Sequence, residues 1–147
     1  MLVKSDPHDK AEIKSVINAL SKALHDKNAE DVVALYTDDT VMFSLAPPLV
    51  LRTDGDLNGL NEWFGTWLGP INVEHRDTVT ETGGDIAFVH GLAHMTGTKT
   101  DGQEVELWFR KTTGFRRTDR GWKISHEHES VPFYMDGSSK AAIDLKP

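Results

Sequence analysis

The stretch FRRTDRGWKISHEHESVP, residues 115–132, carries the clearest structural pattern in the chain. Its centre, Arg120-Gly121, is typical of a tight turn between two antiparallel strands. After this turn the residues at 122–131 fall into two alternating sets, and alternate side chains of a strand point to opposite faces of its sheet. The stretch therefore predicts a β-hairpin near the C-terminal end of the folded domain.

The same pattern extends toward the N-terminus. Gly83-Gly84 and Asp101-Gly102 are two further turn signals. Together with Arg120-Gly121 they divide the second half of the chain into four predicted strands, at residues 71–82, 86–99, 103–118 and 122–131. Long strands joined by tight turns form an antiparallel meander, and such a sheet usually curls because strands twist.

The first half of the chain has the spacing of helices. Asp6-Pro7 combines a capping carboxylate with a proline at the first helical position, and it begins one apolar stripe. That stripe consists of Ile13, Val16, Ile17, Leu20 and Leu24. A second, short helix is predicted after Asn28, with Val32, Val33, Leu35 and Tyr36 as its apolar residues, and it should end at Asp38-Asp39.

A short strand at 41–45 follows and is broken by Pro47-Pro48. Asp54-Gly55 predicts a turn and Asp56 a cap for a third helix, which Gly69-Pro70 should stop. The stripe of that helix is Leu57, Leu60, Phe64, Trp67 and Leu68. The order α-α-β-α-β-β-β-β indicates an α+β fold in which the early helices cover one face of the curved sheet.

Size and charge narrow the possible functions. The chain has 147 residues, a net charge of −7 and no cysteine. The acidic balance argues against binding to nucleic acid or to anionic lipid, and disulfides and thiolate metal sites are excluded. Neither a signal peptide nor a membrane span is recognisable. We therefore expect one cytoplasmic domain at residues 1–132, followed by a C-terminal tail at residues 133–147.

Two segments resemble a known group of proteins. Residues 28–39, NAEDVVALYTDD, and residues 115–132 are similar to the SnoaL-like and ketosteroid isomerase-like group of the nuclear transport factor 2-like superfamily. Residues 115–132 are also similar to the end of the association domain of calcium/calmodulin-dependent kinase. The resemblance covers about residues 10–132. It implies a cone, in which a bent sheet wraps around the helices, a pocket opens at one end, and the outer sheet face forms a dimer interface.

The ketosteroid isomerase machinery is missing from the matching positions. That enzyme uses an Asp base and an oxyanion hole formed by a Tyr and a protonated Asp. The base position falls near Phe43 or Ser44, the Tyr position at Leu20, and the protonated Asp position at Lys111 or Thr113. Because a base must lie within hydrogen-bond reach of its proton, isomerisation by that mechanism is not expected.

The resemblance also implies which side chains face the hollow. The implied inward set is His90, His94, Lys111, Thr113, Glu127 and Glu129. In an enzyme, His90 would be the base, Glu127 its orienting carboxylate or an acid, and Lys111 the partner of a developing oxyanion. His94, Thr113 and Glu129 would contact the ligand, a small apolar or carbonyl-containing molecule. In the alternative, these groups pair with one another in a non-catalytic ligand-binding or dimerisation module.

Other polar and aromatic residues have simpler interpretations. Trp63 and Trp67 lie four apart on the third predicted helix, so they belong to the core or form an aromatic wall for a flat ligand. His8, His25 and His75 are interpreted as surface or strand-edge residues.

A second set of side chains is assigned to the outer sheet face. It comprises Trp108, Arg110, His126 and His128, with Trp122 and Ile124 on the same side. Because aromatic residues and Arg are enriched at interfaces, this face is predicted to form a homodimer. His126 and His128 could instead share a metal, but the sequence spacing identifies no third metal ligand on a neighbouring strand. We therefore predict neither a metal nor a cofactor.

Overall fold

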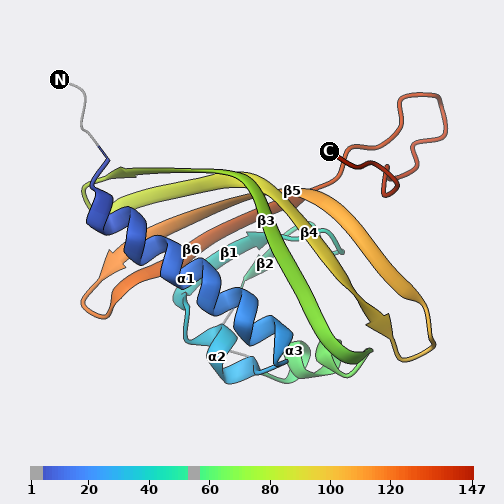
Figure 1. Ribbon diagram of the computed structural model, residues 1–147, viewed down its shortest axis with the longest axis horizontal. Helices are drawn as coiled ribbons and strands as arrows, with labels where there is room; N and C mark the ends of the chain where they lie inside the picture. The colour runs from blue at the N-terminus through green and yellow to red at the C-terminus, as the bar shows by residue number, and fades with distance from the viewer. Residues whose placement is uncertain (1–4, 53–56) are drawn as a thin grey trace.

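The computed structural model describes residues 5–52 and 57–147, which form three helices and a six-stranded sheet (Figure 1). The helices are α1 (Pro7–His25), α2 (Ala29–Val33) and α3 (Leu57–Phe64). The strands are β1 (Tyr36–Phe43), β2 (Leu51–Arg52), β3 (Trp67–Gly83), β4 (Ile86–Lys99), β5 (Glu104–Thr118) and β6 (Gly121–Ser130). The predicted α+β class is confirmed. The predictions for Asp54-Gly55 and Asp56 lie outside the described residues.

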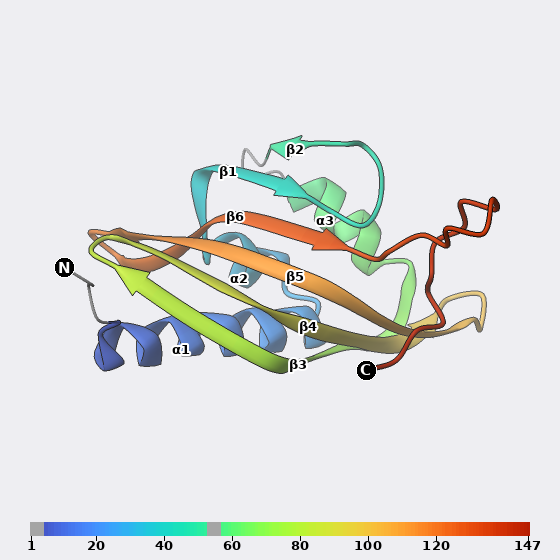
Figure 2. The ribbon, with the colours of Figure 1, turned by 90° about the horizontal axis from the view of Figure 1, so that it is seen from above.

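The sheet has the order β2-β1-β6-β5-β4-β3 and curves over the helices. α1 runs beneath its concave face, and α2 and α3 lie toward one end (Figure 1). The view from above shows the long strands side by side, with the C-terminal tail extending beyond one end of them (Figure 2). β3, β4, β5 and β6 form the predicted antiparallel meander, whereas β1 pairs with β6 in parallel. Thus only part of the sheet is a simple meander.

The first helix forms as its sequence predicts. The Asp6 side chain accepts a hydrogen bond from the backbone N–H of His8 at 2.8 Å, which caps the helix start. Ile13 and Leu20 of its apolar stripe are buried in the core. They pack there with residues of the sheet that include Phe115, Trp122 and Ile124. None of the described helices is long and apolar enough to cross a membrane.

The second and third helices are shorter than predicted. α2 ends at Val33, and Tyr36 begins β1, where it lies opposite Ile124 of β6. α3 ends at Phe64, and Trp67 already belongs to β3. Gly69-Pro70 therefore lies inside a strand and not after a helix. This is possible because β3 is the edge of the sheet, where a proline removes no ladder hydrogen bond.

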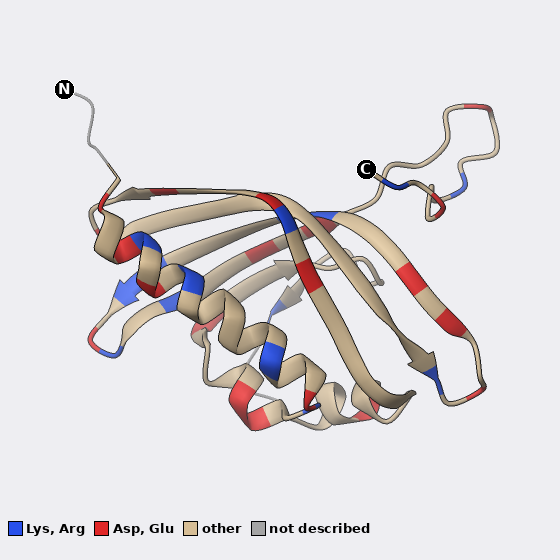
Figure 3. Cartoon of the chain, in the orientation of Figure 1, with Lys and Arg blue, Asp and Glu red and all other residues tan. Residues whose placement is uncertain are grey.

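Two basic residues near the end of β5, Arg116 and Arg117, are paired with carboxylates. Figure 3 shows where basic and acidic residues lie along the chain. Arg116 lies 3.0 Å from Asp39, and Arg117 lies 2.8 Å from Asp9 and 3.1 Å from Asp85. The hydrogen bond from Arg117 holds the pKa of the Asp9 carboxyl below its usual value, against the opposing effect of burial. The pair between Arg117 and Asp9 joins the start of α1 to the end of β5.

Candidate functional site

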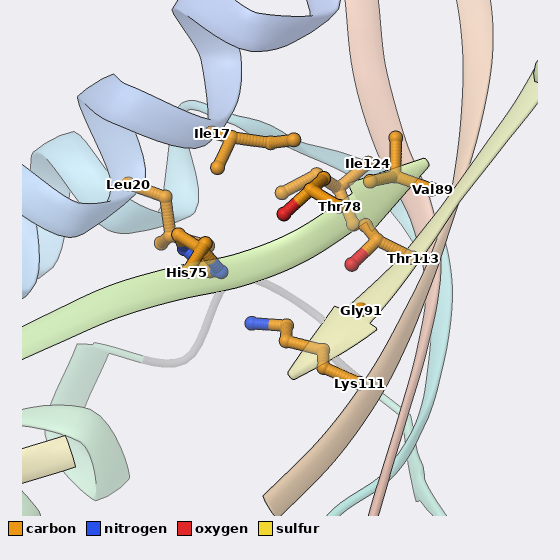
Figure 4. A pocket seen from close by; sticks show the side chains of 9 residues that line it. All are labelled: Ile17, Leu20, His75, Thr78, Val89, Gly91, Lys111, Thr113 and Ile124. Atoms are coloured by element: carbon orange, nitrogen blue, oxygen red, sulfur yellow. The ribbon is translucent and has the colours of Figure 1, made fainter. Parts of the chain in front are cut away.

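A narrow pocket lies between α1 and the concave face of the sheet. Its cavity volume is about 20 Å³, which is room for about one water molecule, and the cavity opens to solvent at its mouth. The lining side chains shown in Figure 4 are Ile17, Leu20, His75, Thr78, Val89, Lys111, Thr113 and Ile124, with Gly91 completing the wall. Most of this wall is apolar, and Lys111 and His75 are its two nitrogen-bearing side chains. Such a wall suits a compact apolar molecule with few polar atoms.

A β-bulge in β3 brings two polar residues to this pocket. The pairing between β3 and β4 shifts between Arg76 and Val79, and Asp77 has a φ of 55°. Because the shift inserts one extra residue, His75 and Thr78 both face the hollow although they are three apart. Gly91 makes room for the bulge, since a Cβ there would lie 3.0 Å from the carbonyl oxygen of Arg76.

Lys111 is the charged centre of the site. Its Nζ lies 3.4 Å from Glu127 Oε1 and 3.8 Å from Glu129 Oε2. The Tyr36 hydroxyl donates a hydrogen bond to the same Oε1 of Glu127 at 2.7 Å. The side chains of Lys111, Glu127 and Glu129 are only 12, 8 and 20 % exposed. We call these four residues, Tyr36, Lys111, Glu127 and Glu129, the lysine cluster.

Burial and pairing shift the pKa values in the lysine cluster. Burial acts to lower the pKa of Lys111, but attraction by Glu127 and Glu129 raises it above its ordinary value. Burial raises the pKa of Glu129 despite the neighbouring ammonium. Burial and the Glu127 charge raise the pKa of Tyr36 well above its usual value. Lys111 is therefore a cation at neutral pH, and Tyr36 is a neutral hydrogen-bond donor.

His75 is the site residue that the sequence did not reveal. It was interpreted as a surface or edge residue, and it keeps solvent exposure at the pocket mouth. Its Nε2 lies 3.4 Å from Ser21 Oγ of α1. Partial burial lowers the pKa of His75 below the usual value of 6.5, and the Lys111 charge lowers it further, while Glu127 acts in the opposite direction. A neutral imidazole therefore faces the pocket at physiological pH.

The prediction that His90 and His94 face inward is wrong. In the pairing of β4 with β5, Gly91 lies opposite Lys111 and His90 lies opposite Thr112. Residues that lie opposite each other on neighbouring strands share a face of the sheet, and adjacent residues of one strand lie on opposite faces. His90 is therefore on the face opposite to that of Lys111. His90 is exposed and stacks beside Phe88 on the outer face. His94 is on the same face, stacked on Trp108 with ring centroids 4.3 Å apart.

The other ligand-binding candidates are divided between three places. Thr113 lines the pocket, whereas Glu129 does not line it and pairs with Lys111. Trp63 and Trp67 do not line the pocket. Trp67 is buried in the core, Trp63 is 37 % exposed, and Lys99 Nζ lies 4.0 Å from the Trp67 ring centroid. This end of β3 thus supports the fold and is separate from the lysine cluster.

The outer face has a different composition from the one predicted. Trp108, Arg110, His126 and His128 do lie there, and His126 Nδ1 donates a hydrogen bond to the Val41 carbonyl at 2.6 Å. Trp122 and Ile124 were expected on this face, but both are buried in the core. A second bulge causes the difference: Gly114 pairs with His126 while Phe115 pairs with Ile124, so Ser125 is inserted and the alternation reverses.

Metal-ligating side chains do not converge within the described ranges. In residues 5–52 and 57–147, no group of three or more His, Asp or Glu side chains is arranged to hold a metal ion. His126 and His128 instead pack edge-on against the Phe43 ring, at centroid distances of 5.0 and 5.2 Å.

Comparisons with known proteins agree with this architecture. A protein of unknown function from Pseudomonas putida, described as nuclear transport factor 2-like, is 28 % identical, with 97 % of this chain and 99 % of that chain covered and a TM-score of 0.85. A ketosteroid isomerase-like protein from Erwinia carotovora is 23 % identical, with 85 % and 97 % covered and a TM-score of 0.70.

A nuclear transport factor 2-like superfamily protein from Salmonella enterica is 18 % identical, with 89 % and 96 % covered and a TM-score of 0.76. No curated protein matches the chain. The model of the SnoaL-like domain family matches residues 13–134, which include most of α1, the whole sheet and the lysine cluster. The chain therefore belongs to the SnoaL-like domain family.

Proposed function

We propose that the pocket binds a compact apolar molecule with a carbonyl oxygen and moves a proton on it. The observation that carries the proposal is the arrangement of one buried cation, Lys111, and one neutral imidazole, His75, on a wall that otherwise consists of aliphatic side chains, two threonines and a glycine. Lys111 would receive the carbonyl oxygen, and the apolar side chains would hold the carbon skeleton.

The proton transfer would use these two groups in sequence. His75 takes a proton from the carbon next to the carbonyl, and the electron pair of the broken C–H bond moves onto the oxygen held by Lys111. In a β,γ-unsaturated ketone, the His75 imidazolium returns the proton to the γ-carbon while the electron pair on oxygen re-forms the carbonyl, which completes an isomerisation. Loss of a hydroxide from the next carbon, protonated as it leaves, completes a dehydration. The lysine cluster supplies the fixed charge in both cases.

A second function is favoured by one specific observation. Lys111 already contacts two carboxylates, so its ammonium is neutralised without a ligand. The pocket would then bind a small molecule without changing it. Ligand binding without any proton exchange distinguishes this non-catalytic module from the enzyme.

Exchange of α-protons with solvent tests the proposed chemistry directly. 2-Indanone is flat, compact and apolar, and its α-protons are acidic for a ketone, so their replacement by deuterium in D₂O can be followed by NMR. The wild-type protein is expected to accelerate this exchange above the buffer rate. Ile17→Trp should fill the pocket and return the rate to that of buffer, because Ile17 lines the wall from α1.

Asn18→Trp is the matched control. Asn18 is the next residue of α1 and is exposed, so the same bulky side chain there points away from the pocket. It should leave the exchange rate unchanged. Equal rates for the wild type and Ile17→Trp would remove the pocket from the chemistry.

We also propose that the outer face contacts a second copy of the chain. Exposed apolar residues continue this surface beyond Trp108 and His128, among them Val79, Ile86 and Phe88. Sedimentation velocity measures the assembly, and a monomer at all concentrations would contradict the proposal.

A further inference from the structure

The charge of the lysine cluster decides which ligands the pocket can accept. One ammonium faces two carboxylates, so the cluster carries a net charge of −1 when both are ionised. All three side chains are largely buried, and charges interact more strongly there than in water. Burial is the main cause of the raised pKa of Glu129, and the Glu127 charge adds to it against the opposing Lys111 ammonium.

The rest of the wall offers no compensating cation. His75 is neutral at physiological pH because its pKa is lowered, and the other lining groups are apolar side chains, two threonine hydroxyls and a glycine. A carboxylate entering the pocket would lose its hydration and meet a cation that is already neutralised. The whole chain, at −7, repels anions as well.

A neutral carbonyl compound meets a different environment. An ammonium has three donors, and its ion pairs with Glu127 at 3.4 Å and Glu129 at 3.8 Å are longer than usual hydrogen bonds and engage at most two of them. Lys111 Nζ has no further partner within residues 5–52 and 57–147, and its side chain points into the pocket (Figure 4). The third donor can therefore bind a ketone or aldehyde oxygen, whose desolvation costs much less than that of an anion.

We propose that the pocket selects neutral carbonyl compounds against carboxylates of the same shape, and that Glu129 is the residue that sets this selectivity. Glu129 acts through Lys111 and does not line the wall itself. Unlike Glu127, it receives no hydrogen bond from Tyr36, so its charge can be removed while the Tyr36–Glu127–Lys111 contacts stay in place. The inference rests on the proposed ligand pocket, since it names the class of molecule bound there.

Acetophenone and benzoate test the selectivity because they differ mainly in replacing a methyl group by a charged oxygen. Their dissociation constants are measured by ligand-observed NMR at pH 7.5, where benzoate is ionised. Wild-type protein is expected to bind acetophenone at least tenfold more tightly than benzoate. This comparison needs no variant and stands even if a substitution impairs folding.

The variant Glu129→Gln then assigns the effect to one residue. It keeps the shape of the side chain and removes one negative charge. The ratio of benzoate affinity to acetophenone affinity should therefore rise about tenfold, an order of magnitude that partly screened charges a few ångströms apart can produce. Glu81→Gln removes the same charge from an exposed position on β3 and should change neither affinity.

The possible results separate the inference from the proposed function. Equal wild-type affinities, or an affinity ratio that Glu129→Gln leaves unchanged, would overturn the selectivity inference. The pocket would still stand if Ile17→Trp abolished acetophenone binding. If wild-type protein bound neither probe, or bound both with no effect of Ile17→Trp, the inference and the proposed pocket would both fall.

Discussion

Replacing His75 with glutamine is expected to slow the α-proton exchange of 2-indanone by about 10²–10⁴-fold, the usual contribution of a positioned general base. Glutamine keeps polar atoms at the pocket mouth but cannot accept the proton. Initial exchange rates by NMR, measured over a range of ketone concentrations, separate this loss from a change in binding. The loss should appear in the maximal rate, with ketone affinity nearly unchanged.

The pH dependence of the wild-type rate follows from the same residue. Burial and the Lys111 charge lower the pKa of His75, so its basic form predominates at neutral pH. The rate should be level there and should fall as the pH drops through a value below 6.5. His75→Gln should lose this acidic limb along with the activity.

His90→Gln is the matched control for the His75 substitution. His90 is exposed on the outer face, opposite Thr112, and therefore cannot reach a ligand in the pocket. Its replacement should leave the exchange rate within the error of the measurement. Loss of exchange in His90→Gln with full activity in His75→Gln would contradict the site described above.

Glu127→Ala is expected to lower the free energy of unfolding by about 3–5 kcal/mol, the range found when one partner of a buried ion pair is removed. The substitution takes from Lys111 its nearer carboxylate and from the Tyr36 hydroxyl its acceptor. Both groups are largely shielded from solvent, so water cannot fully replace the lost partner. Urea unfolding at pH 7, analysed with a common slope, measures the difference.

Two further variants separate charge from hydrogen bonding in this loss. Glu127→Gln keeps an acceptor for Tyr36 and should be less destabilising than Glu127→Ala. Glu81→Ala removes a carboxylate from an exposed strand position and should change stability by less than about 0.5 kcal/mol. If Glu127→Ala lowered the free energy of unfolding no more than Glu81→Ala does, the lysine cluster would not stabilise the fold.

The free energy of unfolding at high pH tests the contribution of the Lys111 ion pairs to stability. Its pKa is raised in the folded protein, so its contribution to stability is complete below the unfolded pKa of about 10.4. That contribution is lost as the pH rises through the higher folded value. The difference between wild type and Glu127→Ala should therefore narrow in strongly alkaline solution.

Most of the fold could be predicted because its signals are local. The cap at Asp6, the apolar stripe of α1 and the turns at Gly84, Gly102 and Gly121 each specify their own part of the backbone, and these elements are present as expected. Tyr36 was wrongly placed in a helix because its apolar ring continues the stripe of α2. Pairing with β6 and the hydrogen bond to Glu127 determine its conformation instead.

The candidate site could be predicted only where strands are regular. Lys111, Thr113 and Glu127 share a face because β5 and β6 pair without interruption between them. His75 was missed because unbroken pairing from the Gly83-Gly84 turn would place it opposite His94, on the outer face. The bulge at Asp77 reverses that orientation, and an Asp with positive φ gives no sequence signal comparable to a glycine.

A crystal structure of the protein with bound acetophenone tests the central claim, that the concave pocket is a ligand site built around Lys111. The ketone oxygen should lie within hydrogen-bond distance of Lys111 Nζ, with the ring against Leu20 and Val89. The account would be contradicted if acetophenone lay on the outer face beside Trp108 and the concave pocket held none.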